Sequence, residues 1–128
     1  MTKAKIEQIV RVWQSRLKLD HWRITVDWQR PSPPGSYAEV ILEGDTYDVA
    51  TVRLDLRGYP KWDQRMANET IVHELVHLHE RDLRFAITSA EDMVAKPAWA
   101  LYWDRVTHER EGLVDRVATV LVELGGLV

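Results

Sequence analysis

The sequence predicts one α+β domain that spans residues 1–128. Apolar residues recur at helical spacing near both ends of the chain and in its middle, whereas they alternate with polar residues over three shorter stretches. The composition agrees with this class, because 45% hydrophobic and 29% charged residues are typical of a soluble globular protein. At 128 residues the chain is long enough for one core but not for two lobes of ordinary size.

Residues 3–18 are expected to form an amphipathic helix that packs on the core. Thr2 is placed to cap its first turn, because a threonine hydroxyl can accept a hydrogen bond from a free N–H group there. Trp13 lies on the apolar face and is expected to be buried. The apolar positions of this helix are Ile6, Ile9, Val10, Trp13 and Leu17.

Three stretches of alternating polarity, residues 22–28, 37–43 and 47–56, are expected to form a small three- or four-stranded sheet. The sheet is expected to be antiparallel or mixed, with one polar face. Proline and glycine interrupt the chain over residues 30–36, and a turn is expected over residues 43–46. Such a sheet could expose an edge to which an extended peptide adds as a further strand. An edge that is only solvated is the alternative.

Residues 64 to about 80 are expected to be a helix with Asp63 as its N-cap. This helix contains the motif His73-Glu74-x-x-His77. Positions i and i+4 lie one above the other on a helix, so the two histidines can direct ring nitrogens at one metal ion. The segment therefore predicts a zinc site.

Glu74 lies about 100° around the helix from His73, where its carboxylate can reach a metal-bound water without being a ligand. Zinc would lower the pKa of that water and polarise a peptide carbonyl, and Glu74 would act as general base. His79 lies about 200° from His77 and is expected to point away from the metal. The alternative is an amphipathic helix whose histidines lie on the surface or in the core.

Residues 81–96 show no clean period and are expected to form a loop that can include a short helical piece. The apolar side chains of this segment are expected to be buried: Leu83, Phe85, Ile87, Met93 and Val94. Pro97 is expected in the first turn of a long last helix, which ends at Gly125-Gly126.

The last helix is expected to supply a third ligand, because a catalytic zinc usually has three protein ligands and one open position. Of its two candidates, Glu111 lies on the more apolar stripe, which should face the motif helix, whereas Glu109 lies on the opposite side. Asp115, four residues after Glu111, is placed to accept a hydrogen bond from a metal-bound imidazole. A solvated carboxylate pair at the helix surface is the alternative.

The pattern His73-Glu74-x-x-His77, followed on a second helix by Glu111-x-x-x-Asp115, resembles the gluzincin pattern of thermolysin-type zinc peptidases. The order of elements is similar to that of minimal single-domain gluzincins and of the small zincin-like peptidases encoded in phage genomes. The motifs cover a small part of the chain, although the element order extends the likeness over most of it. The resemblance implies a zincin-like minimal domain, with Zn²⁺ on His73, His77 and Glu111, with Glu74 as general base and with Asp115 orienting an imidazole.

Full-size gluzincins have a second lobe that completes the cleft, and 128 residues leave no room for a counterpart. The grip on a peptide or protein substrate is therefore expected to come from the sheet edge, from the loops or from a protein partner that completes the cleft. A donor to the oxyanion is also needed. The candidates are His108, about 60° from Glu111 on the last helix, Tyr102 and Tyr59. A pairing or surface role is the alternative for His108, and ordinary packing is favoured for the two tyrosines.

The composition argues against other classes of partner. A net charge of −3, with Lys and Arg scattered, gives no basic patch for nucleic acid. The absence of cysteine excludes disulfides and cysteine-ligated zinc. Neither a signal peptide nor a membrane span is recognised, so no membrane contact and a cytoplasmic location are expected.

The function expected from the sequence is zinc-dependent hydrolysis of peptide bonds. A second enzymatic interpretation applies the same metal chemistry to another amide. The non-enzymatic alternative is a zinc-binding protein-interaction module on a peptidase scaffold. Glu74 favours catalysis, because a structural site needs ligands but no base. A DNA-associated zinc protease is a weaker alternative, since such families commonly use a third histidine and add a cysteine-rich ribbon.

Overall fold

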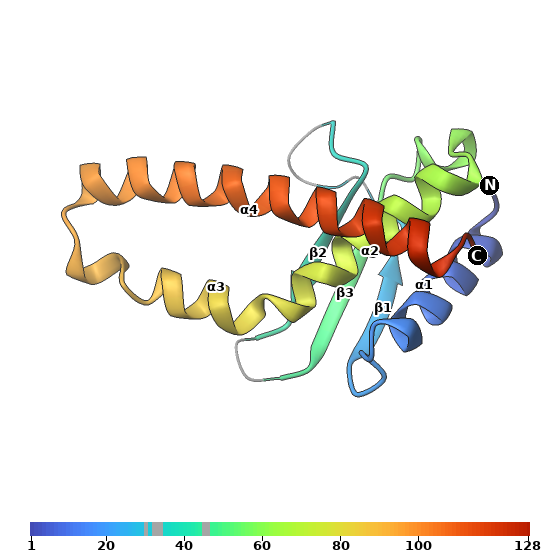
Figure 1. The fold of residues 1–128 in the computed structure, drawn as a ribbon, viewed down its shortest axis with the longest axis horizontal. Coiled ribbons are helices and arrows are strands. Elements are labelled where there is room, and N and C mark those ends of the chain that lie inside the picture. Colours follow the sequence, from blue (N-terminus) through green and yellow to red (C-terminus); the bar gives the residue numbers. More distant parts are fainter. Residues whose placement is uncertain (30, 32–34, 45–46) are drawn as a thin grey trace.

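The computed structural model describes residues 1–29, 31, 35–44 and 47–128. Over these residues the chain is an α+β structure with four α-helices and a three-stranded mixed sheet (Figure 1). The expected break at 30–36 and the turn at 43–46 lie partly outside the described residues. The helices are α1 (Lys3–Arg16), α2 (Gln64–His79), α3 (Arg81–Thr88) and α4 (Lys96–Gly125), and the strands are β1 (Arg23–Asp27), β2 (Ala38–Leu42) and β3 (Val49–Leu54).

The sheet has the order β1-β3-β2, with β1 parallel and β2 antiparallel to the central strand β3. The expected alternation is confirmed in β3, where Ala50, Val52 and Leu54 are fully buried. On the opposite face Arg53 binds Asp27 at 3.2 Å and Glu39 at 2.9 Å, which fastens all three strands together. Among the described strands, β2 therefore lies at one edge and β1 at the other.

Both predicted helix caps are confirmed: the Thr2 side chain accepts a hydrogen bond from Lys5 N–H, and Asp63 accepts one from Met66 N–H. The first is 3.2 Å and the second 2.7 Å long. Each cap satisfies one of the N–H groups that the first turn of a helix leaves without a partner. The caps fix where α1 and α2 begin, and the second one sets the register of the motif helix.

Trp13 is buried in the core, as predicted, and its indole N–H donates to Asn68 Oδ1 at 2.6 Å. The same oxygen accepts a hydrogen bond from the backbone N–H of Val128 at 3.0 Å. A fully buried amide thus links α1, α2 and the segment that follows α4. Because a buried polar group without partners is costly, this network favours one alignment of the three helices.

α4 packs on α2 through buried Val114, Ala118 and Val122, the apolar stripe that the sequence predicts. The long helix brings side chains of α4 opposite the motif. α3 and the first half of α4 extend beyond the sheet in Figure 1. No helix among the described residues combines the length and apolarity needed to cross a membrane.

The segment between α2 and α4 differs in part from expectation. It contains a short helical piece, the eight-residue helix α3, but also a 3₁₀ turn at Glu91–Met93, so less of it is loop than expected. The burial expected there is wrong for Leu83, Phe85, Met93 and Val94, which are 41–86% exposed. The segment projects past the sheet, so apolar composition alone did not bring it into the core (Figure 1).

Candidate metal centre

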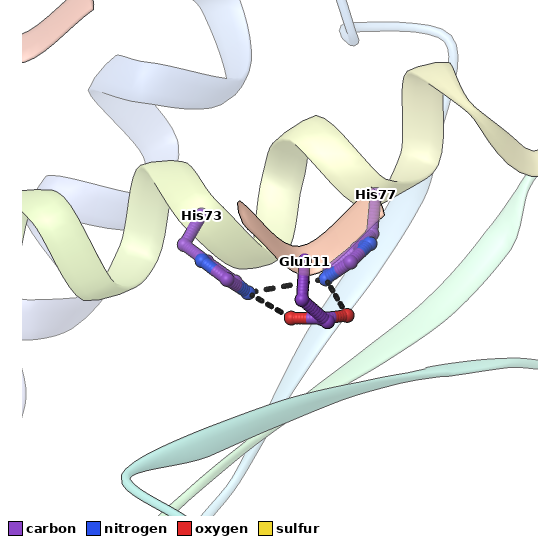
Figure 2. A group of neighbouring side chains, drawn as sticks. All are labelled: His73, His77 and Glu111. Atoms are coloured by element: carbon purple, nitrogen blue, oxygen red, sulfur yellow. Dashed lines mark hydrogen bonds and ion pairs between the residues drawn. The ribbon is translucent and has the colours of Figure 1, made fainter. Parts of the chain in front are cut away.

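The structure brings His73 and His77 of α2 together with Glu111 of α4 (Figure 2). The two Nε2 atoms are 3.1 Å apart. Glu111 reaches both rings, with 3.1 Å from Oε2 to His73 Nε2 and 3.2 Å from Oε1 to His77 Nε2. One ligand atom from each residue therefore lies within 4.8 Å of the other two.

The outer nitrogen of each ring contacts a second carboxylate. Asp115 Oδ1 lies 2.7 Å from His73 Nδ1, and Glu80 Oε1 contacts His77 Nδ1. Carboxylates at this distance accept hydrogen bonds, so both histidines are expected to carry a proton on Nδ1 and a lone pair on Nε2. These contacts fix the orientation of both rings.

The donor set fits a divalent cation. Two Nε2 lone pairs and the carboxylate of Glu111 converge, and three acceptors at such short distances repel one another unless a proton or cation lies between them. In tetrahedral zinc with Zn–N bonds of about 2.0–2.1 Å, neighbouring ligand nitrogens are about 3.3 Å apart. The observed 3.1 Å separation of the nitrogens is close to this value.

Glu80 is itself held by Arg110 of α4, which donates from Nη2 at 2.8 Å and from Nε at 3.2 Å. Burial opposes ionisation of Glu80, but hydrogen bonds from Arg110 and His77 lower its pKa below 4.5. The Arg110 guanidinium also lies over the Trp103 ring, 5.9 Å from its centroid. At neutral pH Glu80 is therefore an ionised carboxylate that can accept a hydrogen bond from His77 Nδ1–H.

Glu74 is a buried carboxyl group, with 7% of the residue exposed. Burial raises its pKa from 4.5 to about 7, and Glu111 adds to this, while His73 and the backbone N–H of Val40 lower it. A group with a pKa near neutral pH can both accept and return a proton at a useful rate. Glu74 lines the same cavity as the three ligand residues.

That cavity has a volume of about 760 Å³ and is lined by residues of α2, α3, α4 and the β2 edge of the sheet. The carbonyl oxygen of Tyr37 accepts a hydrogen bond from Asp55 N–H, and Glu43 N–H donates to the carbonyl oxygen of Val49. The backbone N–H and C=O groups of the odd-numbered residues in this segment therefore point toward β3. The even-numbered residues Ala38 and Val40 consequently direct their backbone groups toward the edge and the cavity.

Three other residues considered in the sequence, His79, Glu109 and His108, lie outside the metal site. His79 lies away from the site, with its Nε2 2.8 Å from the carbonyl oxygen of Leu17. Glu109 forms an exposed ion pair with Arg105. His108 is exposed and is not among the residues that line the cavity, so its expected place beside the site is wrong. At that level of α4 the cavity is lined by Thr107 and Arg110, and His108 is turned toward solvent.

Sequence reasoning missed Glu80 and Arg110. Glu80 lies three residues after His77, a spacing that places two side chains on one face of a helix, and this was an available signal. Arg110 precedes Glu111 in the chain, but its contact with Glu80 depends on how α4 crosses α2, for which the sequence holds no local signal.

Comparisons with protein-family models, with curated proteins and with solved structures find no match for this chain. The function is therefore argued from the residues of the site and their geometry.

Proposed function

We propose that the protein is a zinc-dependent peptidase with a zincin-like fold. His73, His77 and Glu111 would hold the ion, as two neutral imidazoles and one carboxylate. When bound, zinc would lower the pKa of a water molecule and polarise a peptide carbonyl. The observation that carries the proposal is the buried carboxyl group of Glu74, which lines the same cavity as the three donors.

Glu74 would accept a proton from the attacking water on its carboxylate and return it to the leaving amine. Its burial supports this role, because a carboxylate in water is a weaker base than one whose charge is poorly solvated. Asp115 and Glu80 would keep the two imidazoles in one tautomer and orientation. A purely structural zinc site would have no use for such a base.

The edge strand β2 is the element that we propose binds the substrate backbone. Ala38 and Val40 direct backbone groups toward the cavity, where the Val40 N–H donates to Glu74. An extended peptide would pair with this edge as a further strand and would take the place of Glu74 on Val40. The edge would supply a grip that does not depend on a second lobe. Main-chain pairing also suits a substrate that is a peptide rather than another amide, because it recognises successive peptide groups.

The test compares wild type with Glu74→Gln, both stripped of metal and reloaded with one equivalent of zinc. Cleavage of an unfolded general protein substrate is followed by mass spectrometry, and zinc affinity is measured by competition with a chromogenic chelator. We expect zinc-dependent cleavage by wild type and a loss of at least about 100-fold in Glu74→Gln, with zinc still bound.

Glu123→Gln is the matched control, because this carboxylate is exposed and lies outside the cavity. It should retain wild-type cleavage. Equal rates for wild type and Glu74→Gln would reject Glu74 as the base. Tight zinc binding without cleavage of any peptide would instead identify a zinc-binding interaction module on the same scaffold.

A further inference from the structure

The cavity over the metal site has ends of opposite charge. Toward the C-terminal end of α2 it is lined by the guanidinium groups of Arg84 from α3 and Arg110 from α4. Toward the N-terminal end of α2 it is lined by Glu69, and Asp115 lies between this end and the metal site, 2.7 Å from His73 Nδ1. A peptide that occupies the whole cavity would therefore meet basic groups at one end and an acidic group at the other.

Three charged residues of the cavity lining, Arg84, Glu69 and Glu39, do not contact the metal site. Glu39 binds Arg53 of the sheet at 2.9 Å. The Arg84 guanidinium makes no hydrogen bond or ion pair with any residue in the described part of the chain. Glu69 contacts Arg65 at 2.9 Å, but this pair is largely solvated, with side chains 32% and 55% exposed. Such pairs are screened by water and salt, so Glu69 can still interact with a ligand charge.

The direction of β2 relative to α2 is fixed by contacts at both ends. Tyr37, just before β2, packs edge-on against Trp62, just before α2, with ring centroids 6.3 Å apart. At the other end Arg81, which follows α2, binds Asp48 at 2.8 Å, next to the start of β3. The end of β2 pairs with the start of β3, so β2 and α2 run in the same direction (Figure 1).

An extended peptide is expected to pair antiparallel with β2, because antiparallel pairing has the more favourable hydrogen-bond geometry and is the commoner arrangement. Its N-terminal part would then lie near Arg84 and its C-terminal part near Glu69. We infer that the cavity selects extended peptides with an acidic side chain on the N-terminal side of the segment over the metal site and a basic one on the C-terminal side. This inference rests on the proposed peptidase function.

The test uses two isomeric peptide libraries. One has a block of glutamates, a randomised neutral segment and a block of lysines in that order from the N-terminus, and the other has the two blocks exchanged. Both have the same composition and net charge, so attraction to the protein as a whole is equal. Binding is measured by fluorescence anisotropy with zinc-loaded Glu74→Gln, which keeps the ligands but is expected not to cleave.

The library with N-terminal glutamates should bind about fivefold tighter, the size expected for one or two screened charge contacts. Adding Arg84→Glu should abolish or reverse this preference, and Glu69→Lys should act in the same direction at the other end. Arg105→Glu is the matched control, because it reverses an exposed charge of α4 that does not line the cavity. It should leave the preference unchanged. Equal binding of both libraries, or tighter binding of the exchanged one, would overturn the inference.

Cleavage of the same libraries by zinc-loaded wild type separates this inference from the proposed function. The library that binds better should also be cut faster, in a reaction that requires Glu74. Preferential binding without cleavage of either library would retain the charge selection and reject the peptidase. Glu74-dependent cleavage of both libraries at one rate would retain the peptidase and reject the charge selection.

Discussion

Replacing Glu74 by Gln should stabilise the metal-free protein at alkaline pH. The raised pKa means that the folded state holds the proton of Glu74 more tightly than the unfolded chain does. Below pH 4.5 Glu74 is protonated in both the folded and the unfolded state, and its burial does not lower the free energy of unfolding. As the pH rises from 4.5 to about 7, the unfolded chain loses this proton first, so the folded state loses stability.

Above pH 7 the folded state contains a buried carboxylate, and the penalty is constant. A pKa raised from 4.5 to about 7 corresponds to about 3 kcal/mol, at about 1.4 kcal/mol for each tenfold change in the ionisation constant. Glutamine has nearly the same shape and no charge. Glu74→Gln should therefore be more stable than wild type by up to about 3 kcal/mol at pH 8 and by nearly nothing at pH 4.5.

The assay is urea unfolding of both proteins in the presence of a chelator, followed by tryptophan fluorescence at several pH values between 4.5 and 8. Both proteins contain the same histidines, so their direct contribution cancels to first order in the comparison. Glu123→Gln should stay within about 0.5 kcal/mol of wild type throughout, as is usual for an exposed position. A Glu74→Gln protein whose advantage does not grow with pH would refute burial as the cause of the raised pKa.

Three further predictions concern the ligands, their supports and the packing of α4. Glu111→Ala should weaken zinc binding far more than Glu109→Ala, whose side chain lies away from the site; equal effects by calorimetry would reject the assignment of the third ligand. Asp115→Asn and Glu80→Gln should each cost roughly 10 to 100-fold in zinc affinity, the usual range for a group that orients a ligand, and unchanged affinity would remove that residue from the site. Gly125→Ala should destabilise by about 1–3 kcal/mol in urea unfolding, because its Cβ would lie 2.7 Å from the ring of buried Trp13. The control Gly112→Ala meets only an arginine tip at 3.4 Å and should stabilise by up to about 1 kcal/mol; similar effects at both glycines would contradict this packing.

The sequence was informative wherever the structure is local. Periodicity and capping residues identified α1, α2 and α4, and the spacing within α2 placed His73 and His77 on one face. The choice of Glu111 over Glu109 also followed from one helix, because the apolar stripe of α4 had to face the core. In each case the prediction depends only on the spacing of residues within one helix.

The remaining features depend on contacts between distant segments. The parallel pairing of β1 with β3 and the position of β2 at the edge follow from the arrangement of the whole sheet. The error at His108 arose because a helical wheel gives the angle of a side chain but not the width of the cavity at that level. The role of Arg110 was missed because its partner Glu80 lies at the end of another helix, and the contact depends on how α4 crosses α2.

Anomalous scattering at the zinc absorption edge, from crystals of the full chain grown with one equivalent of zinc, tests the central claim most directly. It should show one strong peak among His73 Nε2, His77 Nε2 and the Glu111 carboxylate, at about 2.0–2.2 Å from each. A peak elsewhere, or no peak between the two imidazoles at full zinc loading, would contradict the account.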